Sequence, residues 1–192
     1  MDNASVTADA KHLTTEELEA GLDSIYQSPK DEGVLQLIVR RPQIGERELP
    51  QEAELSLTHG LIGDNWNSRG STRTADGSPN PAAQITVMNA RAIDLVAQGK
   101  DRWPLAGDQL FIDLDLSVTN LPPGTRLAVG SAVIEVSAHP HTGCGKFAAR
   151  FGPEAMKFVN SPLGKRLQLR GINTRVVQPG VIRIGDVVKK TI

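Results

Sequence analysis

The sequence has a single cysteine, few aromatic residues and no long apolar run. Cys144 is the only cysteine among 192 residues, and aromatic residues make up 4% of the chain. One thiol excludes a disulfide within the chain and cannot supply the ligands of a Cys-rich zinc or iron–sulfur site. The net charge of −1 shows no basic surplus of the kind that non-specific nucleic-acid binding needs. We therefore expect no nucleic-acid partner.

Signals for export or membrane insertion are also missing. The first residues, MDNASVTADAKHLTTEELEAG, contain no apolar core of the kind found in a secretory signal. No window approaches the roughly 18 apolar residues of a membrane span. We expect a cytoplasmic protein with no membrane partner.

The composition and length fit one globular domain with a short appendage. Hydrophobic residues make up 39% of the chain and charged residues 22%, which is an ordinary balance for such a domain. Residues 1–33 are predicted to form a tail and a short amphipathic helix, and 34–192 the domain itself. Thr14 and Glu17 have the spacing of a capping box at the start of that helix.

Short strand patterns separated by Gly, Pro and Asn turns dominate the chain from residue 34 onward. Strands are predicted at 34–41, 53–58, 85–88, 110–117, 126–130 and 132–138, with a turn at Gly130-Ser131 between the last two and a final hairpin about Gln178-Pro179-Gly180. In the 110–117 strand, apolar residues alternate with Phe111, Asp113, Asp115 and Ser117, which predicts a half-buried strand. Helices are predicted over 89–98, capped by Asn89, and over 154–159, with Pro153 at the first turn. Residues 65–82 lack any period, which in a compact domain indicates a functional or flexible loop. The pattern predicts a mostly β fold, an antiparallel β-barrel with a few peripheral helices.

The densest group of chemically active residues surrounds the cysteine, in SAHPHTGCGKFAAR (137–150). Glycines on both sides of Cys144 let the backbone turn tightly and let a ligand approach the thiol. His141, Lys146 and Arg150 add positive or proton-accepting groups nearby in the sequence. Cations and backbone N–H groups both favour thiolate over thiol. We therefore predict a reactive and accessible Cys144.

Other interpretations of the same residues stay open at this point. A lone cysteine is commonly an inert, buried apolar group. His139 and His141, two residues apart on an extended segment, might seem suited to share a zinc ion with Cys144. One cysteine and four histidines also permit a papain-like Cys–His pair. Phosphate-binding glycine loops, HExxH and GxSxG are missing, so those enzyme classes receive no support.

Several segments in order resemble the MOSC domain, found at the C-terminal end of molybdenum-cofactor sulfurases. They are Gly60-Leu61-Ile62-Gly63-Asp64, Gly107-Asp108, the run from Leu127 to Ser137, His141-Thr142-Gly143-Cys144-Gly145-Lys146, Arg150-Phe151-Gly152, and Gly180 followed by Gly185-Asp186-Val187-Val188. The likeness covers roughly residues 34–190. It implies a twisted β-barrel of the pyruvate-kinase barrel type.

The resemblance also implies a function for the cysteine. Cys144 matches the family cysteine, which carries sulfur or ligates molybdenum, and Thr142 matches a small hydroxyl residue two positions before it. In some members the ligand is the molybdopterin form of the cofactor. Gln109 lies in Gly107-Asp108-Gln109, where many members have an Arg-x-Asn pair that holds the cofactor, so this chain differs there. It also has Gly143 where many members have proline.

The residues around Cys144 and the family resemblance lead to one hypothesis and one alternative. A thiolate is a soft ligand suited to molybdenum or to a persulfide, so we expect sulfur transfer or molybdenum-dependent redox chemistry at Cys144. The candidates for holding the cofactor, beside Thr142, His141 and Gln109, are basic: Arg73, Arg91, Lys146, Arg150 and Arg170. The chain is too short to include the pyridoxal-phosphate domain of the sulfurases, so sulfur would come from a donor protein. The alternative is a non-catalytic β-barrel that binds ligands or partners and has an inert cysteine.

Overall fold

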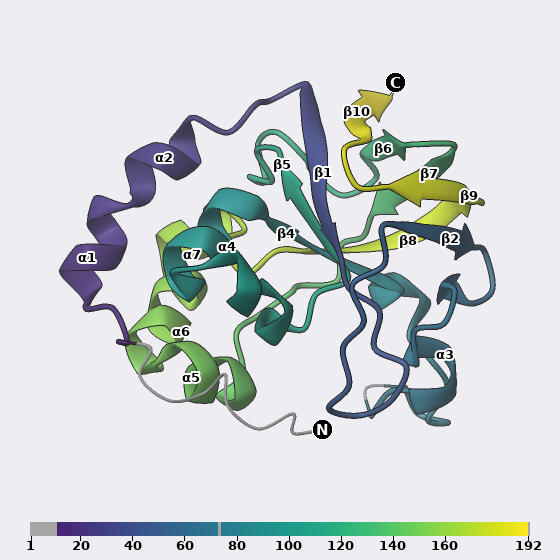
Figure 1. Ribbon diagram of the computed structural model, residues 1–192, viewed down its shortest axis with the longest axis horizontal. Coiled ribbons are helices and arrows are strands. Elements are labelled where there is room, and N and C mark those ends of the chain that lie inside the picture. The colour runs from purple at the N-terminus through teal and green to yellow at the C-terminus, as the bar shows by residue number, and fades with distance from the viewer. Residues whose placement is uncertain (1–10, 73, 192) are drawn as a thin grey trace.

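The computed structural model describes residues 11–72 and 74–191. Within them, seven strands form a closed barrel (Figure 1). Around the barrel the order is β1 (Glu32–Ile38), β10 (Val187–Thr191), β6 (Arg126–Val129), β7 (Ala132–Val136), β8 (Ile172–Gln178), β4 (Ile85–Asn89) and β5 (Leu110–Asp113), which pairs again with β1. The predicted turn at Gly130-Ser131 joins β6 to β7.

The barrel is mostly antiparallel, which confirms the predicted fold class, and it contains one parallel pair. β4 and β5 run parallel, with Val87 opposite Leu110, whereas the other pairs of the barrel are antiparallel. Parallel neighbours need a crossover connection. Here that connection is the helix α4 (Ala90–Ala97) followed by the 3-10 helix η2 (Lys100–Ala106).

A second, smaller sheet lies beside the barrel and consists of β3 (Gly60–Leu61), β2 (Glu52–Ser56) and β9 (Gly180–Arg183). The hairpin predicted about Gln178-Pro179-Gly180 is wrong, because β8 stays in the barrel whereas β9 pairs with β2. Pro179 has no N–H to continue a ladder. Beyond it the chain is held by Ser131, whose hydroxyl accepts from the N–H of Val181 at 2.8 Å.

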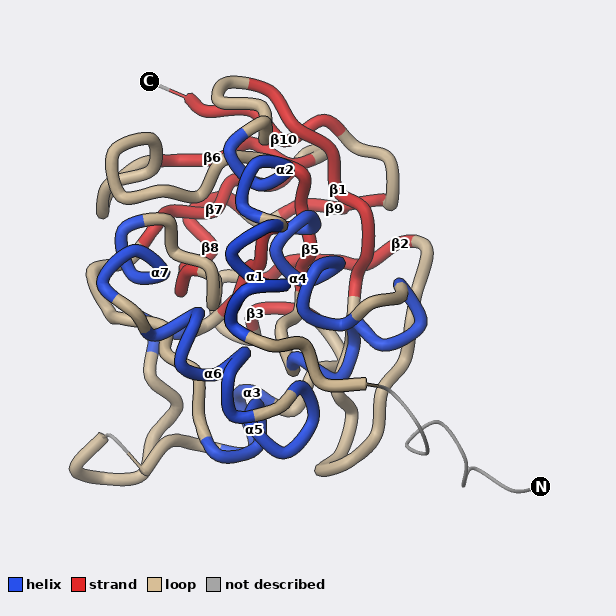
Figure 2. Tube along the Cα trace, turned by 90° about the vertical axis from the view of Figure 1, so that its left-hand side faces the viewer, coloured by secondary structure: helices blue, strands red, loops and turns tan. Residues whose placement is uncertain are grey.

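The larger helices gather on one side of the barrel (Figures 1 and 2). They are α1 (Thr15–Ala20), α2 (Leu22–Tyr26), α4, α5 (Gly145–Phe151), α6 (Pro153–Asn160) and α7 (Pro162–Arg166), while α3 (Trp66–Arg69) and the 3-10 helix η1 (Pro81–Ala83) belong to the 65–83 segment. Among the described residues, none of the helices combines the length and apolar character needed to cross a membrane.

The core therefore has two layers, one inside the barrel and one between barrel and helices. β5 contributes to both: Leu110 and Ile112 point into the barrel, whereas Phe111 packs under the helices. The sequence alternation predicted that Phe111 would lie on a solvent-facing side. That prediction is wrong because the helical layer buries the outer face of the strand as well, and Phe111 has no exposed area.

The N-terminal helix begins as predicted but is interrupted. Thr14 accepts from the N–H of Glu17, and the Glu17 carboxylate accepts from the N–H of Thr14, which confirms the capping box. Gly21 divides the helix into α1 and α2, at a point where a Cβ would lie 2.4 Å from Leu95. Leu18 is buried in the helical layer. Residues 1–10 of the predicted tail lie outside the described residues.

Asn89 joins the two core layers and provides a test of the fold. Its carbonyl oxygen caps α4 by accepting from Ala92 N at 2.9 Å, and its amide donates to Leu114 O and to the Ser28 hydroxyl.

Replacing Asn89 by alanine removes the cap and leaves the buried carbonyl of Leu114 without its donor. We expect Asn89→Ala to lower the free energy of unfolding by about 2–3 kcal/mol in urea titrations. The exposed Asn67→Ala on α3 should change it by less than about 0.5 kcal/mol.

Candidate functional site

Four consecutive backbone carbonyls at the end of η2 each accept a hydrogen bond from a different arginine. Pro104 O accepts from Arg47, Leu105 O from Arg150, Ala106 O from Arg170 and Gly107 O from Arg41. The last carbonyls of a helix have no partner within it and bear partial negative charge. The end of η2 therefore gathers four guanidinium groups from distant parts of the chain, which we call the arginine row (Arg41, Arg47, Arg150 and Arg170).

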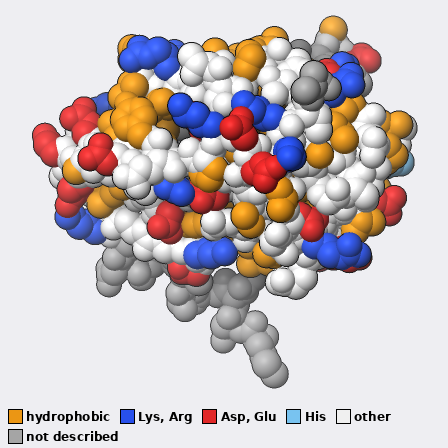
Figure 3. Space-filling view, turned by 90° about the horizontal axis from the view of Figure 1, so that it is seen from above, with side chains coloured by type: hydrophobic (Ala, Val, Ile, Leu, Met, Phe, Trp, Pro, Cys, Tyr) orange, Lys and Arg blue, Asp and Glu red, His pale blue; other side chains and the backbone are white. Residues whose placement is uncertain are grey.

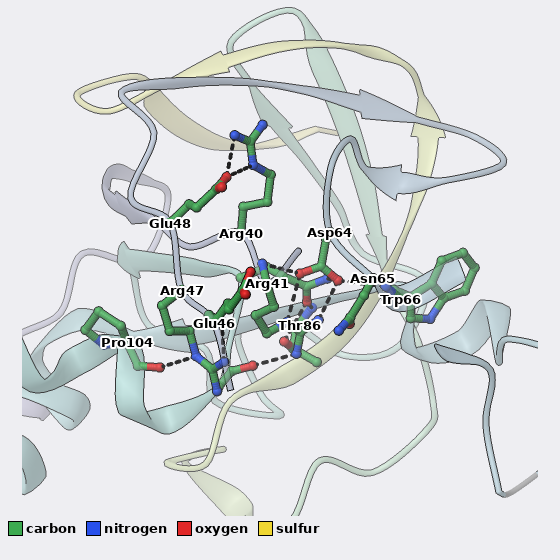
Figure 4. A network of polar contacts seen from close by, with 12 residues as sticks. Arg40, Arg41, Glu46, Arg47, Glu48, Asp64, Asn65, Trp66, Thr86 and Pro104 are labelled. Atoms are coloured by element: carbon green, nitrogen blue, oxygen red, sulfur yellow. Dashed lines mark hydrogen bonds and ion pairs between the residues drawn. The ribbon is translucent and has the colours of Figure 1, made fainter. Parts of the chain in front are cut away.

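Two members of the arginine row are neutralised by carboxylates and two are not. Arg41 binds Asp64 through two bonds of 2.8 and 2.9 Å (Figure 4), and Arg170 binds Asp108 at 2.6 Å. Within residues 11–72 and 74–191, Arg47 and Arg150 form no ion pair within 4.0 Å. Backbone carbonyls satisfy their N–H groups without cancelling their charge.

A fifth arginine extends the positive charge. Burial lowers the pKa of Arg69, and the nearby charge of Arg41 lowers it further. Burial likewise lowers the pKa of Arg47, together with the charges of Arg150 and Arg41. These groups repel one another because they are close and partly desolvated. The region therefore concentrates positive charge, with the Asp64 carboxylate partly opposing it.

The Arg41 end of the arginine row is anchored by a buried polar network. Gln109 has no exposed area; its carbonyl oxygen accepts from the N–H and the hydroxyl of Thr86 at 2.7 and 2.8 Å. Its amide donates to Gln84 O and lies 3.4 Å from the Asp64 carboxylate. Asp64 also accepts from the N–H of Trp66 (Figure 4). Gln109 therefore holds the carboxylate that orients Arg41, and faces the interior of the protein.

The Arg170 end contains a buried carboxylate with an imidazole beside it. Asp108 is fully buried, and burial raises the pKa of its carboxyl, against the opposing effect of Arg170. Its second oxygen lies 3.5 Å from Nδ1 of His141. The Arg170 guanidinium also stacks on Phe147, 5.0 Å from the ring centre, which stabilises a desolvated cation. Phe147 lies in the first part of α5, the helix that follows the cysteine.

Cys144 occupies the position just before α5 and is exposed. Partial burial by itself would raise the pKa of the thiol. The backbone N–H groups of Phe147 and Lys146 and the charges of Arg170 and Lys146 outweigh that effect, so the pKa is lowered. The preceding turn is fixed by Asn160, which accepts from Gly143 N at 2.8 Å and donates to Gly143 O at 3.1 Å. The thiol is therefore accessible and partly activated, rather than enclosed by aliphatic side chains.

The remaining candidates from the sequence fall in different places. Thr142 and Lys146 are exposed in the cysteine turn. Arg91 instead binds Asp113 in a surface groove lined by residues of α2, α4 and η2, which includes no residue of the cysteine turn. Arg73 lies outside the described residues.

Sequence reasoning missed Arg41, Arg47 and Arg69 as members of this site. Only a weak signal was present: two adjacent arginines before a proline at the end of the first strand, and an arginine in the loop without period. Within residues 11–72 and 74–191, His, Cys, Asp and Glu side chains form no group of three or more arranged to hold a metal ion. The structure thus provides no protein-only ligand set of the kind that the zinc interpretation requires.

The fold and the site together define a class: a β-barrel protein with an accessible thiol near a cluster of arginines. The MOSC domain family matches residues 79–189. Because the match spans more than half of the chain, the protein belongs to the MOSC domain family, which is associated with molybdenum-cofactor binding or sulfur handling. Arg41, Arg47 and Arg69 lie before the matched segment.

Similar solved structures support the fold. The YuaD protein from Bacillus subtilis has a TM-score of 0.58 and 15% identity over 83% of this chain and 95% of that chain. YiiM from Escherichia coli has a TM-score of 0.52 and 20% identity, covering 83% and 70%. YiiM from Geobacillus stearothermophilus has a TM-score of 0.53 and 15% identity, covering 83% and 73%. A comparison with curated proteins found no match.

The lowered pKa of Cys144 predicts its alkylation profile. The rate with iodoacetamide follows the thiolate fraction, so half of the maximal rate should be reached at a lower pH than for glutathione measured alongside. Lys146→Gln removes one of the charges that lower the pKa and should move the midpoint upward. Both midpoints are measured by quenching the reaction at set times and determining the alkylated fraction of the intact chain by mass spectrometry. A wild-type profile that coincides with that of glutathione would contradict the prediction.

Proposed function

We propose that this protein binds a molybdopterin-type molybdenum cofactor, with the Cys144 thiolate as the protein ligand to molybdenum and the arginine row as the site of the cofactor phosphate. The observation that carries the proposal is the pair Arg47 and Arg150, whose donors are oriented by carbonyls while neither side chain forms an ion pair with a carboxylate of the described residues. Such a pair suits a phosphate, which accepts charge-assisted bonds from several donors.

The donor set also fits the metal. An exposed cysteine of lowered pKa supplies a soft anionic ligand. Arg170 lies between the two regions, bonded to the η2 carbonyl row at one end and stacked on Phe147 at the other. One extended ligand could therefore meet the arginine row with its phosphate and Cys144 with its metal. When bound, the cofactor would supply two-electron redox chemistry.

The protein residues perform distinct tasks in this proposal. Cys144 is the anionic ligand, and the N–H groups of the first turn of α5 stabilise its charge. Arg47, Arg69 and Arg150 bind the phosphate. Asp64 holds Arg41 in an ion pair, so that Arg41 does not move toward the phosphate. The same thiolate is suited to carry sulfur as a persulfide, delivered by a donor protein. The alternative, a binding module with an inert thiol, requires a shielded cysteine of ordinary pKa and is not favoured by the exposure of Cys144.

Cofactor retention tests the role of the cysteine. The full chain is expressed in cells that make the molybdenum cofactor, then assayed for molybdenum by elemental analysis and for pterin by fluorescence after oxidation. We expect both in the wild type, and loss of molybdenum in Cys144→Ser with an unchanged circular dichroism spectrum. The exposed Ser68→Ala is the matched control and should retain both.

Two other outcomes of this experiment can be distinguished from the expected one. Protein that is one sulfur atom heavier, and loses that mass on reduction, would indicate persulfide carriage by Cys144. Wild-type protein that holds no molybdenum, no pterin and no additional sulfur would contradict the proposal.

Binding of inorganic phosphate tests the arginine row without the cofactor. A ligand that binds only the folded state raises Tm, so phosphate should stabilise the wild type at low ionic strength and less so in added salt. Removing one charge-assisted contact weakens binding by about tenfold or more, so Arg47→Gln should need correspondingly more phosphate for the same shift. Without phosphate its Tm should be equal or higher, because a repulsion is removed. Arg126→Gln on β6 is the control; an equal response in both variants would contradict the assignment.

A further inference from the structure

A cavity that includes Arg170 of the arginine row, but not Arg41, Arg47 or Arg150, opens beside the cysteine turn. Its volume is about 460 Å³, and Thr142, two residues before Cys144, lies in its wall together with His139, His141 and Arg170. One part of the wall is apolar, formed by Val118, Pro123, Val136 and Val159. A cavity with apolar walls and a few converging polar groups is the usual form of a small-molecule site.

The charged and titratable groups of this wall are all basic. They are His139, His141, Lys165 and Arg170, and among the described residues no Asp or Glu lines the cavity. By contrast, basic and acidic side chains are interspersed on the face shown in Figure 3. The nearest carboxylate behind the wall is Asp108, which is fully buried and engaged by Arg170.

Asp108 lies next to two groups of the cavity wall, Arg170 and His141. One of its oxygens binds Arg170 at 2.6 Å and the other lies 3.5 Å from Nδ1 of His141. The buried carboxylate of Asp108 is therefore placed beside the imidazole of His141. The Nε of Arg170 is buried and has no hydrogen-bond partner among the described residues. A buried donor of this kind, in a side chain that is 8% exposed, has the capacity to bind one acceptor atom of a ligand or a water molecule.

We propose that this cavity, whose wall includes Thr142 of the cysteine turn, binds the substrate, and that the substrate is a small organic anion with an apolar body. His141 and Arg170 face its anionic group, Lys165 attracts it from the rim, and the valine-lined wall covers its apolar part. The inference depends on the proposed function for the reactive role of Cys144. It differs in assigning a second anion site, which shares Arg170 with the arginine row but does not include Arg47 or Arg150, the pair proposed for the cofactor phosphate.

Two alkylating reagents of nearly equal size and different charge test this assignment. Iodoacetate and iodoacetamide each convert the Cys144 thiolate to a thioether with release of iodide, and only iodoacetate is an anion. The measured quantity is the ratio of their rate constants at Cys144, relative to the same ratio for glutathione. The full chain is prepared from cells that cannot make the molybdenum cofactor, so that failure to bind cofactor does not affect the result.

We expect the relative ratio to exceed unity by roughly three- to tenfold, the effect of one or two partly screened charge contacts. The iodoacetate rate should also saturate with concentration, whereas the iodoacetamide rate stays linear. His141→Gln should bring the ratio close to that of glutathione while keeping the iodoacetamide rate within about twofold. Lys165→Gln, an exposed change that does not endanger folding, should lower it in part. Arg166→Gln, exposed on the same helix outside the cavity, should leave it unchanged.

Two results would overturn the inference. One is a wild-type ratio equal to that of glutathione, because the cavity would then exert no pull on an anion. The other is a high ratio that falls in Arg47→Gln but not in His141→Gln or Lys165→Gln, because the attraction would then come from the arginine row alone. The proposed function would survive either result, since it is tested by molybdenum, pterin and phosphate binding.

Discussion

The hydrogen bonds between arginines and the last carbonyls of η2 are the interaction on which the site depends. A carbonyl satisfies a guanidinium N–H but does not cancel its charge, whereas a carboxylate does both. By using Leu105 O for Arg150 and Pro104 O for Arg47, the fold fixes two cations in position and leaves their charge for a ligand. The positive φ of Gly107, +88°, ends η2 at the point where the next carbonyl can turn to Arg41.

The parallel pair of the barrel explains why this arrangement arises here. Parallel β4 and β5 require a crossover, and α4 with η2 provides it. The crossover must end immediately before β5, so its terminal carbonyls lie at the rim of the barrel. Segments from the end of β1, from α5 and from the approach to β8 meet at that rim, and each contributes an arginine. The parallel pair of β4 and β5, the one departure from an antiparallel barrel among the described residues, thus brings the arginines of the site together.

Features governed by neighbouring residues could be predicted from the sequence. The Thr14–Glu17 capping box, the Asn89 cap of α4 and the helix beginning at Pro153 all depend on contacts within a few residues. Features governed by distant contacts could not. Phe111 is buried because helices far along the chain cover β5, and β9 leaves its neighbour β8 for β2 because of Ser131.

The site shows the same division. The cysteine turn was found because its glycines, thiol and basic groups are adjacent in the sequence. Arg41 and Arg170 join the same row although they come from opposite ends of the domain, so no local pattern connects them. The role of Gln109 could not be predicted from its motif position alone. The strand β5, which follows Gln109, decides whether its side chain faces a ligand or the interior of the protein. Its contacts with Thr86 and Gln84 place it in the interior.

The contribution of the buried ion pair Asp108–Arg170 to stability is relevant to its function. Burying an ion pair commonly stabilises a protein no more than an apolar pair of equal volume, because both charges lose their hydration. Here the cost is increased, since Arg170 has a donor without a partner and burial raises the pKa of the Asp108 carboxyl. Stability alone therefore does not account for the pair. Its position does: the pair places the Arg170 member of the arginine row near Cys144 and one carboxylate beside His141, so that the proposed phosphate site and the proposed substrate cavity share a buried ion pair.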